Sequence, residues 1–83
     1  MKTQDLKTTQ NIGQHIVTFY YSWMESWVGY VIHKQGDDYY EKSGRVCIDN
    51  AKLIDFDGTF SLPVVVAEAL KREGIKVDES FTK

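Results

Sequence analysis

The side chains of this 83-residue chain that could do chemistry are two histidines, one cysteine and a short run of aspartates. His15 and His33 could approach each other across a hairpin, and Glu41 could reach them from the next strand. A zinc site needs a third and a fourth ligand, so two imidazoles do not make one. We interpret Cys47, whose cationic neighbour is Arg45, as a small buried apolar side chain. These groups predict no metal site, no cofactor and no catalytic residue.

The aspartates lie in the segment Leu53-Ile54-Asp55-Phe56-Asp57-Gly58-Thr59. It resembles the first motif of the haloacid-dehalogenase-like phosphatases. The resemblance implies Asp55 as the nucleophile, Asp57 as the general acid/base, and magnesium as the cofactor. That family uses a parallel, doubly wound domain, and the 24 residues between Thr59 and residue 83 are too few for its remaining strands and helices. We therefore interpret the segment as a tight turn, in which Asp accepts backbone hydrogen bonds and Gly58 takes a positive φ.

Apolar periodicity predicts the elements that would position these residues. A period of two indicates strands, and a period near 3.6 indicates a helix. We expect a small antiparallel meander of three to four strands, packed on one face by a single C-terminal helix, which is an α+β fold. The expected strands are 15–23, 26–34, 39–48 and 53–56, with a bulge or bend at Ser43-Gly44 and a short edge strand over 75–78.

The first two strands have a preferred register. A four-residue loop, 23–26, would place Phe19 opposite Tyr30 and Val17 opposite Ile32 on one face. On the other face, Tyr20 would cover Gly29, an arrangement that repairs a weak strand position. A slip by one residue would also give tolerable pairs, so both registers stay open at this point.

The predicted helix covers 62–73. Ser61 is its expected N-cap, and Pro63 suits a first turn because its missing N–H has no partner there. Gly74 fits the left-handed position after the last turn, which lets Ile75 fold back on Leu70. Valines 64–66 have poor helix propensity, so tertiary packing must hold this helix.

Length and charge indicate one domain, 1–83, with a loose arm over 1–11 and a frayed tail over 79–83. Ten Lys and Arg against twelve Asp and Glu give a net charge of −2 without a basic cluster. We therefore expect neither a nucleic acid nor a membrane as partner. A lone cysteine and a polar start without an apolar signal region favour a cytoplasmic protein.

Aromatic residues are in surplus on the predicted sheet. They fall on both strand faces, yet one helix covers only one face. Since Trp and Tyr are enriched in cores and interfaces, we favour a non-enzymatic interaction protein that forms a homodimer through an aromatic sheet face. A protein or small-molecule partner, the latter in an aromatic-lined pocket, is the alternative. The predicted interface residues are Tyr20, Trp23, Trp27 and Tyr30.

Overall fold

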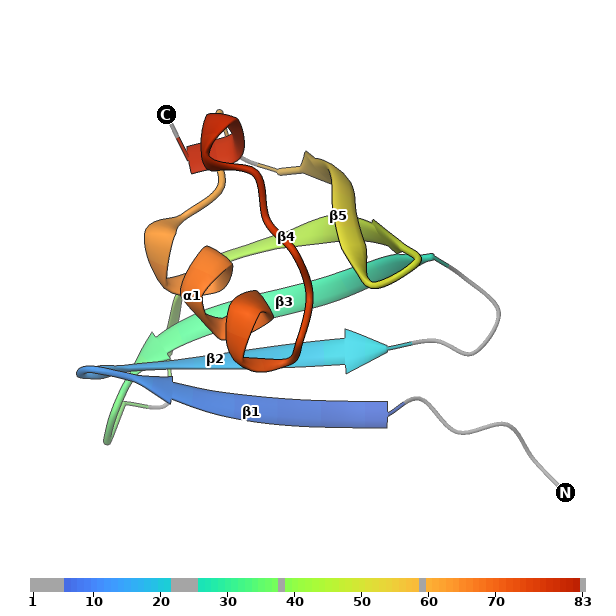
Figure 1. The fold of residues 1–83 in the computed structure, drawn as a ribbon. Coiled ribbons are helices and arrows are strands. Elements are labelled where there is room, and N and C mark those ends of the chain that lie inside the picture. The colour runs from blue at the N-terminus through green and yellow to red at the C-terminus, as the bar shows by residue number, and fades with distance from the viewer. Residues whose placement is uncertain (1–5, 22–25, 38, 59, 83) are drawn as a thin grey trace, which may run out of the picture.

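Five strands form one antiparallel sheet, in the order in which they follow along the chain (Figure 1). The computed structural model describes residues 6–21, 26–37, 39–58 and 60–82. The elements are β1 (Leu6–Ile12), β2 (His15–Tyr21), β3 (Trp27–Lys34), β4 (Tyr40–Asp49), β5 (Lys52–Asp57), α1 (Val64–Arg72) and the 3₁₀ helix η1 (Glu79–Thr82). The α+β meander packed by a single α-helix is confirmed, with five strands in the described residues instead of three or four.

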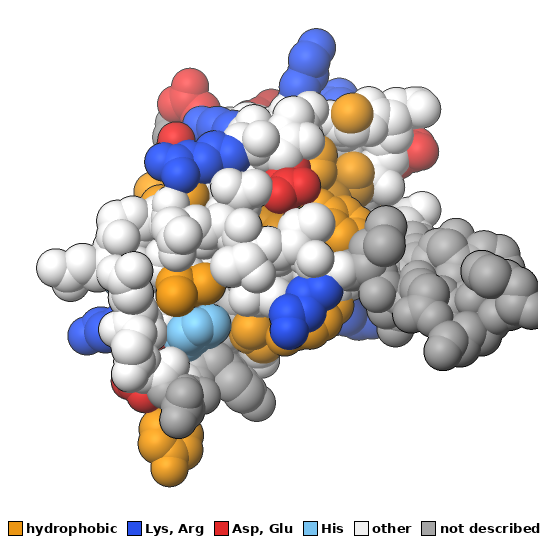
Figure 2. All heavy atoms as spheres, turned by 90° about the horizontal axis from the view of Figure 1, so that it is seen from below, with side chains coloured by type: hydrophobic (Ala, Val, Ile, Leu, Met, Phe, Trp, Pro, Cys, Tyr) orange, Lys and Arg blue, Asp and Glu red, His pale blue; other side chains and the backbone are white. Residues whose placement is uncertain are grey.

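The additional strand is β1, where the sequence predicted a loose arm over 1–11. All seven of its residues pair with β2, from Leu6 opposite Tyr21 to Ile12 opposite His15. Its pattern escaped detection because the side chains between its ends are polar. Seen from the β1 side, hydrophobic side chains form separate groups between mostly polar ones (Figure 2). Residues 6–12 are therefore ordered by pairing with β2, although their own sequence has no strong strand pattern.

The register of β2 against β3 agrees with the prediction. Val17 pairs with Ile32, Phe19 with Tyr30, and Tyr20 with Gly29. Val17, Phe19, Tyr30 and Ile32 are at most 2% exposed, so this face of the hairpin enters the core. The predicted loop around Trp23 lies outside the described residues.

The predicted bulge at Ser43-Gly44 is wrong, because β4 continues through Gly44 opposite Tyr30. The glycine is required instead by close packing: a Cβ atom there would lie 2.6 Å from Tyr30 Oη and 2.8 Å from the Asp57 carbonyl oxygen. The irregularity lies further up the strand. Ile32 pairs with Lys42 and His33 with Tyr40, which leaves Glu41 as the extra residue.

The β4–β5 hairpin closes through a two-residue loop. Asn50 and Ala51 have φ values of 53° and 59°, between the paired Asp49 and Lys52. Two positive φ values give the loop a twist that matches the two strands. Asn tolerates this region better than Ala does, so Ala51 is a mildly strained position.

Helix α1 begins two residues later than predicted, and Ser61 is not its N-cap. Pro63 takes that place with φ −58° and ψ 140°, and its carbonyl oxygen accepts hydrogen bonds from the N–H groups of Val66 and Ala67. A residue that precedes proline is biased toward extended backbone, which keeps Leu62 out of the helix.

The C-terminal end of α1 follows the prediction. Gly74 has a φ of 86°, its N–H donates to the Lys71 carbonyl oxygen, and the Ile75 N–H donates to that of Leu70. This is the Schellman arrangement, and it returns Ile75 to the core, where it is 9% exposed. The expected edge strand over 75–78 is reduced to one parallel bridge between Lys76 and Lys52.

The tail is ordered where the sequence predicted fraying. Residues 79–82 form η1, and the Leu62 N–H donates to the Phe81 carbonyl oxygen at 2.7 Å. The Phe81 ring meets that of Phe56 edge to face, with centroids 5.7 Å apart. Phe81 therefore holds the tail on the helix side of the sheet.

Polar contacts fasten α1 to β1 and β2. Gln10 donates a hydrogen bond to the Glu73 carboxylate, and Arg72 Nη1 donates one at 2.8 Å to the carbonyl oxygen of Asn11. Burial, followed by the negative charge of Glu73, raises the pKa of Tyr21 above its usual value. With Leu70 and Val66 fully buried beneath them, these contacts set the helix across the β1 end of the sheet.

Candidate functional site

The face of the sheet opposite α1, here called the outer face, is covered by no element that the structure describes. Side chains alternate between the two faces of a strand, and α1, Phe81 and the core all lie on the other side. The outer-face positions, given by the strand register, include Lys7, Thr9, Ile16, Thr18, Tyr20, Trp27, Gly29, Val31, His33, Ser43, Arg45, Cys47, Asp55 and Asp57. This face is the candidate functional site.

One row of paired residues crosses the outer face through all five strands, and we call it the transverse row. It consists of Lys7, Tyr20, Gly29, Arg45 and Asp57, one from each strand. A cation thus stands at the β1 end and a carboxylate at the β5 end. Between them lie an aromatic ring, a position without a side chain, and a second cation.

Arg45 links the aromatic part of the outer face to its acidic end. Its Nη2 donates a hydrogen bond to Asp57 Oδ2 at 2.7 Å, and its guanidinium carbon lies 5.1 Å from the Trp27 ring centroid. The Arg45 hydrogen bond, a second one from the Gly58 N–H and the Arg45 charge hold the pKa of Asp57 below its usual range. Both side chains remain more than half exposed, so they are ordered yet accessible.

Tyr20 and Gly29 form the other part of the row. Lys7 Nζ lies 6.0 Å from the Tyr20 ring centroid, within cation–π range, and Tyr20 is 43% exposed. A Cβ atom on Gly29 would meet no atom of the described residues within 4 Å. The predicted cover of Gly29 by Tyr20 is therefore wrong, because an aromatic ring above the glycine would have filled that space. The row is open at its centre.

The four predicted interface residues have different places in the structure. Tyr20 and Trp27 lie on the outer face, where Trp27 is half-buried beside Arg45. Tyr30 is 1% exposed and belongs to the core, so it is removed from the exposed binding set. Trp23 lies outside the described residues.

Lys7 and Arg45 were missed as members of a site. Arg45 could have been assigned to the same strand face as Cys47 from the sequence, because the two residues are two positions apart in one predicted strand. Lys7 could have been found only by recognising β1, whose Thr8-x-Gln10-x-Ile12 pattern alternates weakly before a Gly-Gln turn.

Both aspartates of the phosphatase-like segment lie in β5, near its end, and Gly58 follows directly after the strand. Asp55 Oδ1 accepts a hydrogen bond from the Phe56 N–H, Asp57 is bound by Arg45, and Gly58 has a φ of 102°. Gly58 thus takes the predicted positive φ, and the sheet is antiparallel, unlike the parallel sheet of that family. Among the described residues, no group of three or more His, Cys, Asp or Glu could hold a metal ion.

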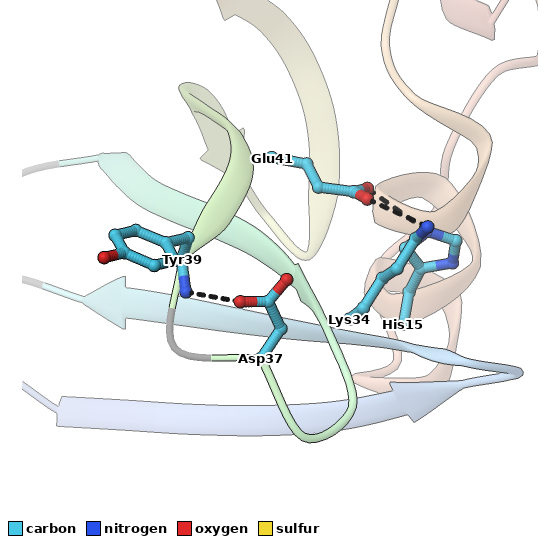
Figure 3. A network of polar contacts seen from close by, with 5 residues as sticks. All are labelled: His15, Lys34, Asp37, Tyr39 and Glu41. Carbon is cyan, nitrogen blue, oxygen red and sulfur yellow. Dashed lines mark hydrogen bonds and ion pairs between the residues drawn. The ribbon is translucent and has the colours of Figure 1, made fainter.

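A second polar cluster lies at the opposite end of the sheet (Figure 3). His15 Nε2 is 3.3 Å from Glu41 Oε1, and Lys34 Nζ is 3.7 Å from Glu41 Oε2. The predicted approach of Glu41 to His15 is present, and the bulge provides it. His33 pairs with Ile16, next to His15 on the strand, so the two histidines leave opposite faces of the sheet. Half-exposed ion pairs of this kind contribute little to stability.

No protein-family model, no curated protein and no solved structure matches the chain. The case for function therefore depends on the outer face itself.

None of the helices within the described ranges has the length and apolar character needed to cross a membrane.

Proposed function

We propose that this protein works by binding, without catalysis, and that its outer face joins two copies into a homodimer. The observation that carries the proposal is a sheet face that no described element covers, with two aromatic side chains, Tyr20 and Trp27, between charges of opposite sign. Aromatic side chains with a polar or cationic neighbour are enriched in protein interfaces. The hydrogen-bonded Arg45 adds a guanidinium group, another feature over-represented at such surfaces.

The outer face has the size that a small dimer interface needs. Five strands about 4.8 Å apart, each contributing about six residues of roughly 3.3 Å, give a face of about 24 by 20 Å. Its plan area is on the order of 500 Å², and the relief of the side chains adds accessible surface to that. Stable interfaces bury about 600–1,000 Å² on each partner.

The proposal is tested by the solution mass, measured by size-exclusion chromatography with light scattering over a range of concentrations. We expect twice the 9.6 kDa of one chain. Trp27→Ala should shift the dissociation constant upward by tenfold or more, as expected for a central aromatic anchor of about 1.4 kcal/mol. The control is Tyr39→Ala, since Tyr39 is an aromatic residue 82% exposed in the turn before β4. A wild-type mass of one chain at every concentration, or equal effects of the two variants, would contradict the proposal.

A small-molecule ligand on the same face is the second candidate, and the open space above Gly29 favours it. The space between the sheet and α1 is filled by Phe19, Tyr30 and Leu70, each at most 1% exposed, so a ligand would bind on the outer face. A planar anion could lie on Gly29 between Tyr20 and Arg45. Tryptophan fluorescence against a panel of aromatic carboxylates tests this, and Gly29→Leu, which fills the space, should abolish any response.

A further inference from the structure

The order of charges along the transverse row determines how two outer faces can meet. When two copies of a sheet pack face to face with their strands aligned, the two-fold axis lies between the sheets and runs either along the strands or across them. These two axes bring different residues of the row together. The inference below rests on the proposed homodimer and specifies its geometry.

An axis that crosses the strands at Gly29, the height of the row, would place each residue of the row opposite its own copy. Lys7 would then face Lys7, and Arg45 would face Arg45, because the row lies at one height along the strands. Like charges placed opposite one another in an interface are unfavourable. The acidic end at Asp57 would meet its own copy as well.

An axis along the strands exchanges the two halves of the sheet instead. With the axis on the central strand β3, β1 faces β5 of the other copy and β2 faces β4. Lys7 then approaches Asp57, and Tyr20 approaches Arg45. Every charged contact of the row is thereby matched with an opposite charge or an aromatic ring.

We infer that the two copies pack face to face about a two-fold axis that runs along β3 at Gly29, with Lys7 and Tyr20 of each copy against Asp57 and Arg45 of the other.

The exposure of these side chains suits this arrangement. Arg45 lies over Trp27 in its own chain and is 57% exposed, so its guanidinium group can also accept a ring from outside. Tyr20 is 43% exposed and supplies that ring. Gly29, which has no side chain to hold the sheets apart, lies on the axis between them.

The twist of packed sheets leaves these contacts within reach. Aligned sheets cross at about 30°, and the ends of the row lie two strand spacings, or about 10 Å, from the axis. The rotation therefore displaces Lys7 from Asp57 by roughly 5 Å. A lysine side chain has four rotatable carbons and can follow that displacement. Tyr20 and Arg45, at half the distance from the axis, are displaced about half as far.

The experiment is a set of charge-neutral variants, with the dissociation constant of the dimer as readout. Lys7→Gln should weaken the dimer about fivefold, because each dimer contains two such contacts at the partly exposed rim. Asp57→Asn should weaken it by a similar factor, and the double variant should lose no more than either single one. The control, Lys71→Gln, removes the same charge from the exposed side of α1 and should change nothing.

Other outcomes overturn the inference or separate it from the proposed function. A dimer that Lys7→Gln tightens has its axis across the strands, because the change would then relieve Lys7–Lys7 repulsion. A third outcome is a dimer that Trp27→Ala weakens but that Lys7→Gln and Asp57→Asn either leave unchanged or weaken by independent, additive amounts. Such a dimer uses the outer face in another orientation. A wild-type monomer at all concentrations refutes the homodimer itself.

Discussion

Replacement of Gly44 by alanine is the sharpest test of how the core of this protein is packed. The added Cβ would lie 2.6 Å from Tyr30 Oη, 2.9 Å from Tyr30 Cζ and 2.8 Å from the carbonyl oxygen of Asp57. Neither neighbour can move easily, since Tyr30 is 1% exposed and Asp57 is held in register with Arg45 on β4. The clash therefore has to be relieved by moving β5 or the ring.

The magnitude follows from two opposing effects. Forcing an extra methyl group into a packed core costs about 1–3 kcal/mol. Replacing glycine with alanine also restricts the unfolded chain, which returns about 0.4–1 kcal/mol. We expect Gly44→Ala to lower the free energy of unfolding by about 1–2 kcal/mol, a loss of roughly 5–15 °C in Tm for a chain of this size.

The assay is thermal and urea unfolding followed by circular dichroism, at low protein concentration so that association does not add to stability. Gly29→Ala is the matched control, because it is the same change in the adjacent strand with no atom within 4 Å. It should be neutral or stabilising by up to about 1 kcal/mol. Equal stability of the two variants would refute the close packing of the Tyr30 ring against Gly44.

Three further outcomes are expected. Ala51→Gly should raise the free energy of unfolding by about 0.5–1 kcal/mol, because glycine removes the strain of a φ of 59°, and urea unfolding measures it. The pKa of Tyr21 is raised above its usual value of 10.0, so the stability that its neutral hydroxyl contributes is present below pH 10 and is lost as the pH rises from there through the folded pKa; Tyr21→Phe should therefore lose less stability than wild type when the pH is raised above 10. Leu70→Ala, at a fully buried position under α1, should cost about 2–5 kcal/mol and leave the protein largely unfolded at 37 °C, as circular dichroism would show.

The parts of the fold that could be predicted are those with strong local signals. Alternation from Val17 to Tyr21, read against that from Val28 to Ile32, favoured the register that β2 and β3 have, although it left a slip by one residue open. Gly74 indicated the end of α1, because few residues other than glycine adopt a φ of 86°. The strand β1 was missed because an edge strand needs few apolar side chains of its own. Gly44 was misread because a strand glycine can mark either a bulge or a close approach.

The candidate site was predictable only in its aromatic part. Alternation put Tyr20 and Trp27 on one strand face and Tyr30 on the other, but it did not say which face enters the core, and the predicted interface therefore combined residues of both faces. The transverse row depends on the registers of four successive strand pairs, so residues as distant as Lys7 and Asp57 become neighbours of one row only after the sheet is assembled. An irregular pairing, such as the extra Glu41, shifts every partner beyond it and cannot be located from periodicity.

The hydrogen bond from Arg72 to the Asn11 carbonyl oxygen also bears on aggregation. Carbonyl groups on one edge of a strand are the acceptors that an incoming strand would use to lengthen the sheet into a fibril. Arg72 occupies the acceptor nearest the β1–β2 turn, so an added chain would have to displace a charged guanidinium before pairing along the whole of β1. We therefore expect the arginine in the last turn of α1 to oppose lateral growth of the sheet as well.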